Sequence, residues 1–192
     1  METEFEVKIL DIDVAYIQSK LETIGANMRL GKRKMRRFVY ELYPPQENAW
    51  LRLRDDGEKI TLCVKKIHAD TIDGTKQHEK VVGNFYKTHH QILKSGHLPI
   101  AYQENERISY MLNGAAVEID FWPGIPPHLE IEGSSVEEIE NMVSRLGYTM
   151  ENTTTINVPD IYKLYGRCIE DYNIENFYPG KKRIEILESS LV

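Results

Sequence analysis

The chain has 192 residues, 41% hydrophobic and 28% charged, a balance typical of one compact domain with its own core. The formal net charge of −6 at pH 7 argues against a dedicated nucleic-acid-binding protein. No apolar run reaches the ~18 residues of a membrane helix, and the first residues are acidic rather than a basic leader. Because Cys63 and Cys168 lie far apart and form no disulfide framework or metal motif, we expect a cytoplasmic protein.

The first half of the chain alternates between strand and helix patterns. Residues 2–10 alternate strictly between polar and apolar, which predicts a half-buried strand. Apolar residues then recur at helical spacing over residues 13–27 and stop at Gly25. Four short strands are predicted next, at residues 38–42, 50–54, 60–66 and 77–82. A hairpin turn is predicted between the second and the third of them.

The second half continues the same pattern. A helix is predicted at residues 85–94, and the dipeptide Asn113-Gly114 predicts a hairpin between two further strands. Ser135 and Glu138 form a capping box that begins another helix. The remaining predicted elements are strands at 108–112, 116–121 and 128–132, an edge strand at 157–158 and a short helix at 160–169.

About eight strands and three or four helices on one chain predict an α+β fold. The hairpins require mostly antiparallel pairing, which favours a closed barrel with helices packed outside over a doubly wound sheet. We expect one domain over residues 1–172 and a C-terminal tail over residues 173–192. The basic cluster Lys181-Lys182-Arg183 in this tail is a candidate contact with a second copy of the chain.

Six strand segments share one feature: ionisable residues repeat at every second position, with aliphatic residues on the opposite face. An antiparallel sheet with one solvated face also shows this pattern. If the sheet closes, however, these charges line an interior, where they are costly unless they are paired or hold a ligand. The members of this set are Glu4, Glu6, Lys8, Arg52, Arg54, Lys65, Glu79, Arg107, Glu118, Asp120, Glu130 and Glu132.

The chemistry of this set indicates a metal and an oligophosphate. Arg and Lys that converge from several strands suit an anion with several phosphoryl groups. Carboxylates in the same cavity would repel that anion unless a divalent cation lies between them, and hard oxygen ligands select Mg²⁺ or Mn²⁺.

The segment Glu4-Phe5-Glu6-Val7-Lys8 resembles the N-terminal ExExK signature of the CYTH superfamily, the triphosphate tunnel metalloenzymes. This group includes class IV adenylate cyclases, thiamine triphosphatases and inorganic triphosphatases. The resemblance covers about residues 2–165 and implies an eight-stranded antiparallel barrel whose tunnel holds a triphosphate with Mg²⁺ or Mn²⁺. The later matching residues are Arg52, Arg54, Thr61 to Lys65, Glu79, Arg107, Asp120 and Glu130-Ile131-Glu132-Gly133.

The resemblance also implies a role for each site residue. The implied metal ligands are Glu4, Glu6, Glu132 and Asp120. The implied triphosphate contacts are Lys8, Arg52, Arg54, Lys65, Arg107 and Lys163. Glu130, Lys8 and Arg107 are the implied catalytic residues, and Glu79 and Glu118 are carboxylates that support them.

Two positions depart from the family pattern. Asn105 stands where many members have a lysine two residues before the late arginine, and Gln77 stands where the central strand often has a first acidic residue. Both departures bear on how the distal phosphates are held and therefore on which substrate is used.

Three functions follow from this site. We expect hydrolysis of the terminal phosphoanhydride of an inorganic or organic triphosphate, with Glu130 orienting a water molecule. The alternatives are a class IV adenylate cyclase that converts ATP to cyclic AMP and pyrophosphate, and a triphosphate-binding sensor without turnover. No membrane partner is expected, and nucleic acid is not a favoured ligand.

Several other residues are interpreted as structural. The basic run at residues 32–37 is interpreted as a solvated loop at the tunnel mouth, with a nucleotide or RNA contact as the alternative. Trp50 and Trp122 are interpreted as packing residues. No metal role is expected for the histidines, because His89 and His90 would point about 100° apart on a helix.

Overall fold

The fold is described from a computed structural model, which defines residues 1–176. The basic cluster Lys181-Lys182-Arg183 and most of the predicted tail lie outside the described residues.

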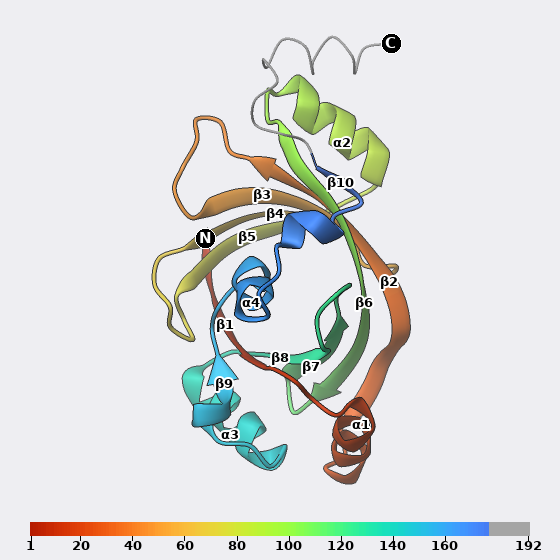
Figure 1. The fold of residues 1–192 in the computed structure, drawn as a ribbon, viewed down its shortest axis with the longest axis vertical. Helices are drawn as coiled ribbons and strands as arrows, with labels where there is room; N and C mark the ends of the chain where they lie inside the picture. The colour runs from red at the N-terminus through yellow and green to blue at the C-terminus, as the bar shows by residue number, and fades with distance from the viewer. Residues whose placement is uncertain (177–192) are drawn as a thin grey trace.

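A closed antiparallel barrel of eight long strands forms the centre of the molecule (Figure 1). The strands follow one another around the barrel in the order β6-β2-β3-β4-β5-β1-β8-β7, and β7 pairs again with β6. This closure confirms the predicted α+β barrel. The strands are β1 (Glu2–Ile9), β2 (Asn27–Glu41), β3 (Ala49–Asp55), β4 (Ile60–Ile67), β5 (Thr75–Val82), β6 (Pro99–Leu112), β7 (Ala115–Phe121) and β8 (His128–Gly133).

Shorter elements complete the fold. Two-residue strands extend the sheet at its margins: β9 (Thr153–Thr154) pairs with β1, and β10 (Glu175–Asn176) pairs with β6. The helices are α1 (Val14–Thr23), α2 (Phe85–Lys94), α3 (Val136–Arg145) and α4 (Val158–Leu164), with the 3₁₀ turns η1 (Met150–Asn152) and η2 (Ile169–Tyr172).

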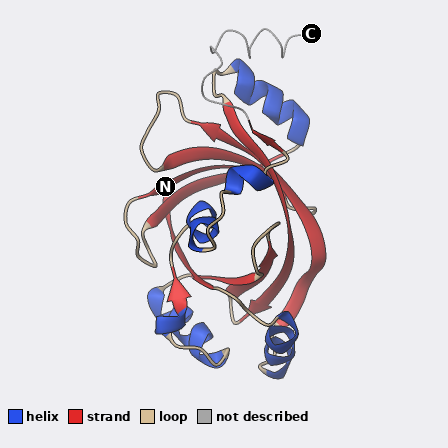
Figure 2. Cartoon of the chain, viewed as in Figure 1, coloured by secondary structure: helices blue, strands red, loops and turns tan. Residues whose placement is uncertain are grey.

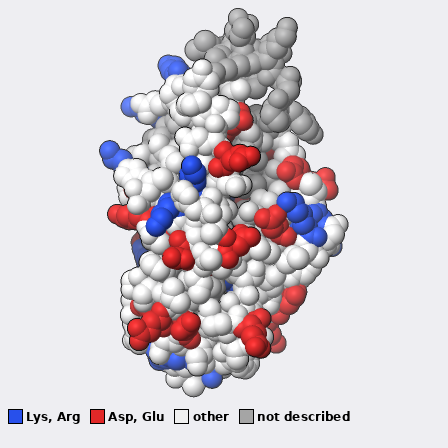
Figure 3. Space-filling model, turned by 90° about the vertical axis from the view of Figure 1, so that its left-hand side faces the viewer, with Lys and Arg blue, Asp and Glu red and all other residues white. Residues whose placement is uncertain are grey.

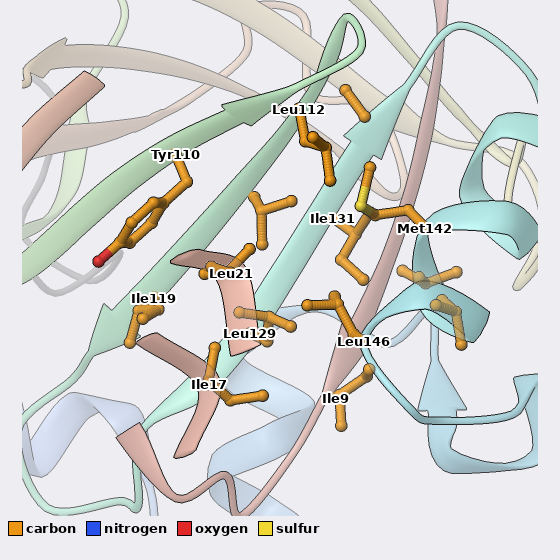
Figure 4. Close-up of a cluster of buried hydrophobic side chains, with 14 of the residues drawn as sticks. Ile9, Ile17, Leu21, Tyr110, Leu112, Ile119, Leu129, Ile131, Met142 and Leu146 are labelled. Atoms are coloured by element: carbon orange, nitrogen blue, oxygen red, sulfur yellow. The ribbon is translucent and has the colours of Figure 1, made fainter. Parts of the chain in front are cut away.

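Three helices, α1, α2 and α3, pack on the outer, aliphatic faces of the strands (Figure 2). The largest core lies between α1, α3 and the outer faces of β1, β6, β7 and β8, with Ile17, Leu21 and Ile131 fully buried (Figure 4). A second core joins Phe85 and Ile92 of α2 to β2 and β3. These cores keep aliphatic residues outside the barrel wall, so the charged residues of the same strands face the interior.

The fourth helix has a different place. In the view of Figure 1, α4 lies across the barrel instead of beside it. Ile161 and Tyr162 of α4 pack against Trp122, which directly follows β7. The helix begins at Asn157, whose side chain accepts a hydrogen bond from the backbone N–H of Asp160 at 3.0 Å. The edge strand predicted at residues 157–158 is therefore wrong, because this segment is the start of a helix.

The predicted hairpin at Asn113-Gly114 is confirmed. Both residues have positive φ angles, 52° and 99°, as the two central positions of a type I′ turn require. Residues 32–37, in contrast, form no loop: they lie within β2 and pair with β6 and β3.

No helix among the described residues is long and apolar enough to cross a membrane. On the face shown in Figure 3, acidic and basic side chains occur in small groups of both signs rather than in one extended basic patch.

Candidate active site

The barrel encloses a cavity of about 530 Å³, lined by the inward-facing side chains of its strands. Successive strand residues point to opposite faces, so the period-two charge pattern of the sequence becomes the lining of this cavity. The cavity brings together almost all the predicted site residues: Glu4, Glu6, Lys8, Arg52, Arg54, Lys65, Glu79, Arg107, Glu118, Asp120, Glu130 and Glu132.

Lys163 is placed elsewhere. Its side chain on α4 is 73% exposed, and its ammonium group contacts Asp160 on the same helix at 2.7 Å. It is not among the residues that line the cavity. The expectation that it points into the tunnel does not agree with this arrangement, because its position on the short helix turns it toward solvent.

One side of the cavity is acidic. The antiparallel register of β1, β8 and β7 sets Glu6 opposite Glu132, and Glu130 opposite both Lys8 and Glu118. Neighbouring strands thereby concentrate carboxylates of like charge. We call this side the acidic wall; it consists of Glu4, Glu6, Glu118, Asp120, Glu130 and Glu132.

Three cations neutralise part of the acidic wall. Lys65 reaches both carboxylate oxygens of Glu4, at 2.7 and 2.6 Å, and Lys8 contacts Glu6 at 2.8 Å. Arg107 donates from Nε to Asp120 at 2.6 Å and lies 3.4 Å from Glu130. Burial alone would raise the pKa of Glu130, but Arg107 and Lys8 outweigh it and hold that pKa well below its usual range.

Glu132 has no such partner among the described residues. Burial, together with the neighbouring carboxylates Glu4 and Glu130, raises the pKa of Glu132 to about 7. Burial also raises the pKa of Glu4, although Lys65 opposes the shift. The acidic wall thus carries more negative charge than its own cations balance.

The opposite side of the cavity is basic. Arg52 and Arg54 of β3 share a single carboxylate, Glu79 of β5, at 3.7 and 3.4 Å. Burial and the neighbouring guanidinium groups of Arg52 and Arg107 lower the pKa of Arg54 to about 10. We call this side the basic wall; it consists of Arg37, Arg52 and Arg54, and Lys65, which contacts Glu4, lies between the two walls.

His128 is a residue that the sequence interpretation missed. It is fully buried on β8, two positions before Glu130, and its Nε2 lies 3.9 Å from Asp120. One ligand atom each of Asp120, His128 and Glu130 lies within 4.8 Å of the others, so these residues form a possible metal-binding group. The signal was present, because residues 128, 130 and 132 share one face of the strand.

Arg37 was also missed, and the interpretation of the tryptophans as packing residues was incomplete. Arg37 points into the cavity from β2, and its guanidinium lies 4.6 Å from the ring centre of Trp122. Trp50 and Trp122 both line the cavity, although Trp122 also packs against α4 as a core residue. The missed signal was the period of two within this run: Arg33, Met35 and Arg37 occupy every second position and all three line the cavity.

No protein-family model matches the chain, and no curated protein matches its sequence. Solved structures do share its fold. A conserved hypothetical protein from Pyrococcus furiosus superposes with a TM-score of 0.67 at 22% identity, covering 81% of this chain and 98% of its own. A "putative adenylate cyclase" from Vibrio parahaemolyticus has a TM-score of 0.69 at 11% identity, covering 84% and 98%.

A third structure, from Hippeastrum, is described as an adenylyl cyclase candidate with a dominant triphosphatase activity. Its TM-score is 0.53 at 13% identity, and the match covers 98% of this chain and 96% of the other. At these identities the likenesses show the fold. The chain shares the closed antiparallel barrel fold of these structures, so the fold that the CYTH resemblance implied is confirmed.

Proposed function

We propose that this chain, built on a CYTH-like tunnel fold, is a metal-dependent enzyme that hydrolyses the terminal phosphoanhydride of a triphosphate in the barrel cavity. One observation carries the proposal: the two walls of the cavity carry opposite charge that their own ion pairs do not neutralise. A metal cation and a phosphate chain, bound together, neutralise both walls.

The acidic wall fits a divalent cation. Its donors are carboxylate oxygens, which Mg²⁺ and Mn²⁺ prefer. Glu132 lacks a cationic partner among the described residues, and burial, together with crowding by Glu4 and Glu130, raises its pKa to about 7. Glu4, Glu6, Glu130 and Glu132 would hold the metal, with Asp120 and His128 as further donors. When bound, a divalent cation neutralises phosphate oxygens and the charge that develops in the reaction.

The basic wall suits the phosphate chain. Planar guanidinium groups bind phosphoryl oxygens through paired hydrogen bonds, and Lys65 adds a point charge. Arg52 and Arg54 have only Glu79 to share, and the Nε of each has no hydrogen-bond partner among the described residues. Donors of this kind, fixed before the substrate arrives, orient it without reorganisation at the moment of reaction.

Glu130 is our candidate for orienting the attacking water. Arg107 and Lys8 keep its carboxylate ionised, so it can accept a hydrogen bond from water and orient it, while the proton of the water ends on the released orthophosphate. Attack on the terminal phosphorus forms a new P–O bond and breaks the bond to the bridging oxygen. Orthophosphate and a diphosphate leave, and Arg107 holds Glu130 and Asp120 in position through the reaction.

Cyclisation of ATP is a second candidate reaction, and the position of Trp50 favours it. Trp50 and Ile67 line the cavity beside Lys65, and an indole can stack on a nucleobase. In that reaction the ribose 3′-hydroxyl attacks the α-phosphorus, and pyrophosphate leaves. The two reactions differ in their products, so product analysis separates them.

The test is an assay of purified protein with Mg²⁺ or Mn²⁺ and three separate substrates: tripolyphosphate, thiamine triphosphate and ATP. We expect orthophosphate release that is lost in the Glu4→Gln/Glu6→Gln variant. The matched control is Glu2→Gln, an exposed residue at the start of the same strand, which should retain activity.

Each other outcome has a defined meaning. Cyclic AMP with pyrophosphate from ATP would favour the cyclase. Metal-dependent binding without product would indicate a sensor. If none of the three substrates binds, the proposed use of the tunnel is wrong.

A further inference from the structure

The basic run of β2 divides into two faces with different surroundings. The outward residues Lys32, Lys34 and Arg36 each form an ion pair with a carboxylate on a neighbouring strand: Glu106, Glu104 and Asp55. Arg37 faces inward and is 7% exposed. No carboxylate oxygen lies within ion-pairing distance of Arg37 among residues 1–176.

Two neighbours hold the Arg37 guanidinium in place. It lies 4.6 Å from the ring centre of Trp122, a cation–π contact, and its NH2 group donates a hydrogen bond to Oδ1 of Asn105. Asn105 in turn donates from Nδ2 to Asp120 at 3.2 Å. Trp122 itself is fixed by an edge contact with Tyr162 of α4, with ring centres 6.5 Å apart.

The comparison with Arg107 shows what Arg37 lacks. Both side chains are buried, at 7% and 9% exposure, but Arg107 is paired with Asp120 and Glu130. The Nε of Arg37 has no hydrogen-bond partner among the described residues. A buried charge without a counter-ion is costly, and a ligand of negative charge would offset that cost.

The surroundings of Arg37 select an anion as that ligand. Burial, followed by the charges of Arg52, Arg54 and Arg107, holds the pKa of Arg37 well below its usual range. Guanidinium groups that converge on one space attract a polyanion, and Asn157 and Val158 at the start of α4 border the same cavity.

We propose that Arg37 is a substrate-binding residue whose guanidinium, presented by Trp122 and Asn105, contacts the phosphoryl group nearest α4. The proposal rests on the proposed function and adds one binding residue to it. The cation at the end of the tunnel near α4 is Arg37 of β2, which lies beside Asn105 of β6. Arg37 would thereby distinguish ligands long enough to reach α4 from shorter ones.

The experiment measures binding of diimidotriphosphate, in which NH groups replace the bridging oxygens and resist hydrolysis, by calorimetry with Mg²⁺. Arg37→Gln keeps a donor for Asn105 and removes the charge, and should weaken binding by about 10- to 100-fold. The matched control is Arg36→Gln, the adjacent outward residue, which should bind within about twofold of the unsubstituted protein.

Two further measurements separate binding from a structural role. Without ligand, the melting temperature of Arg37→Gln should equal that of the unsubstituted protein or exceed it by about 2–4 °C, because an uncompensated buried charge is removed. Adding Asn105→Lys to Arg37→Gln returns a cation to the same space from β6, and should recover most of the lost affinity. If Arg37→Gln does not fold, Arg37→Met serves the same comparisons.

The outcomes are distinguishable. Absence of binding by the unsubstituted protein refutes the proposed function and the role of Arg37 with it. Normal binding by Arg37→Gln, or a loss that Asn105→Lys does not repair in folded protein, overturns the role of Arg37 alone.

Discussion

Substituting glutamine for Glu132 should stabilise the metal-free protein at alkaline pH, although it removes a residue of the proposed metal site. The reason is the crowding of the acidic wall. Burial and the neighbouring Glu4 and Glu130 raise the pKa of Glu132 from 4.5 to about 7. A carboxyl group with a raised pKa in the folded state binds its proton more tightly there than in the unfolded chain. Its ionisation therefore opposes folding.

The magnitude follows from linkage. A change in pKa from 4.5 to about 7 corresponds to about 3 kcal/mol at pH 8, at 1.36 kcal/mol for each pKa unit. Glu132 is not fully buried and solvent screens part of this, so we expect about 2–3 kcal/mol. The loss of stability begins as pH rises through the unfolded pKa and is complete above the folded one. At pH 5 the difference between the variant and the unsubstituted protein should fall below about 1 kcal/mol.

The assay is thermal unfolding of both proteins at pH 5 and pH 8 in EDTA. For a chain of this length the expected gain at pH 8 is a rise in melting temperature of about 5–10 °C. Glu140→Gln, an exposed glutamate on α3, is the matched control and should change little. Adding Mg²⁺ or Mn²⁺ should raise the melting temperature of the unsubstituted protein more than that of Glu132→Gln. A variant that is less stable at pH 8, or a gain that does not depend on pH, would refute this reasoning.

Three other substitutions test the site and the packing around it. Asp120→Asn should destabilise the metal-free protein by about 3 kcal/mol in urea unfolding, because it breaks the bidentate pair with buried Arg107; a change under about 1 kcal/mol would contradict this. Lys163→Ala should leave triphosphate binding and turnover unchanged, since its side chain is exposed and its one ion pair within residues 1–176 is with Asp160; a tenfold loss would place it in the site after all. Gly124→Ala should reduce the free energy of unfolding by about 2 kcal/mol or more and so lower the melting temperature by several degrees. The residue has a φ of 81°, and an added Cβ would lie 2.2 Å from the Tyr172 ring, so a neutral result would mean that η2 is displaced at little cost.

The barrel could be predicted from the sequence because its strands have one aliphatic and one charged face. Residues 50–54 and 60–66 show this alternation directly, and a hairpin signal joins them, so β3 and β4 differ from the prediction only at their ends. The helices were predictable for a similar reason, since their apolar positions recur at helical spacing and their N-caps are explicit.

The long strands β2 and β6 were only partly predictable. Lys32 and Lys34 of β2 pair with Glu106 and Glu104 of β6 on the outer face, while the inner face carries charges as well. With polar residues on both faces, such segments cannot be distinguished from loops by hydropathy. Irregularities in the β2–β6 register between Met28 and Arg33 also interrupt the period-two pattern.

The sequence by itself determined which residues share a strand face, because side chains of an extended chain alternate with a fixed period of two. This alternation alone was enough to identify most of the charged residues that line the cavity. Only the tertiary structure decided which charges meet across the barrel, since that depends on how the sheet closes and how its strands are staggered. Closure brings Lys65 of β4 to Glu4 of β1, leaves Glu132 without a cation and leaves Arg37 without a carboxylate among the described residues. The unmatched charges, rather than the number of charges, distinguish a binding site from a solvated face.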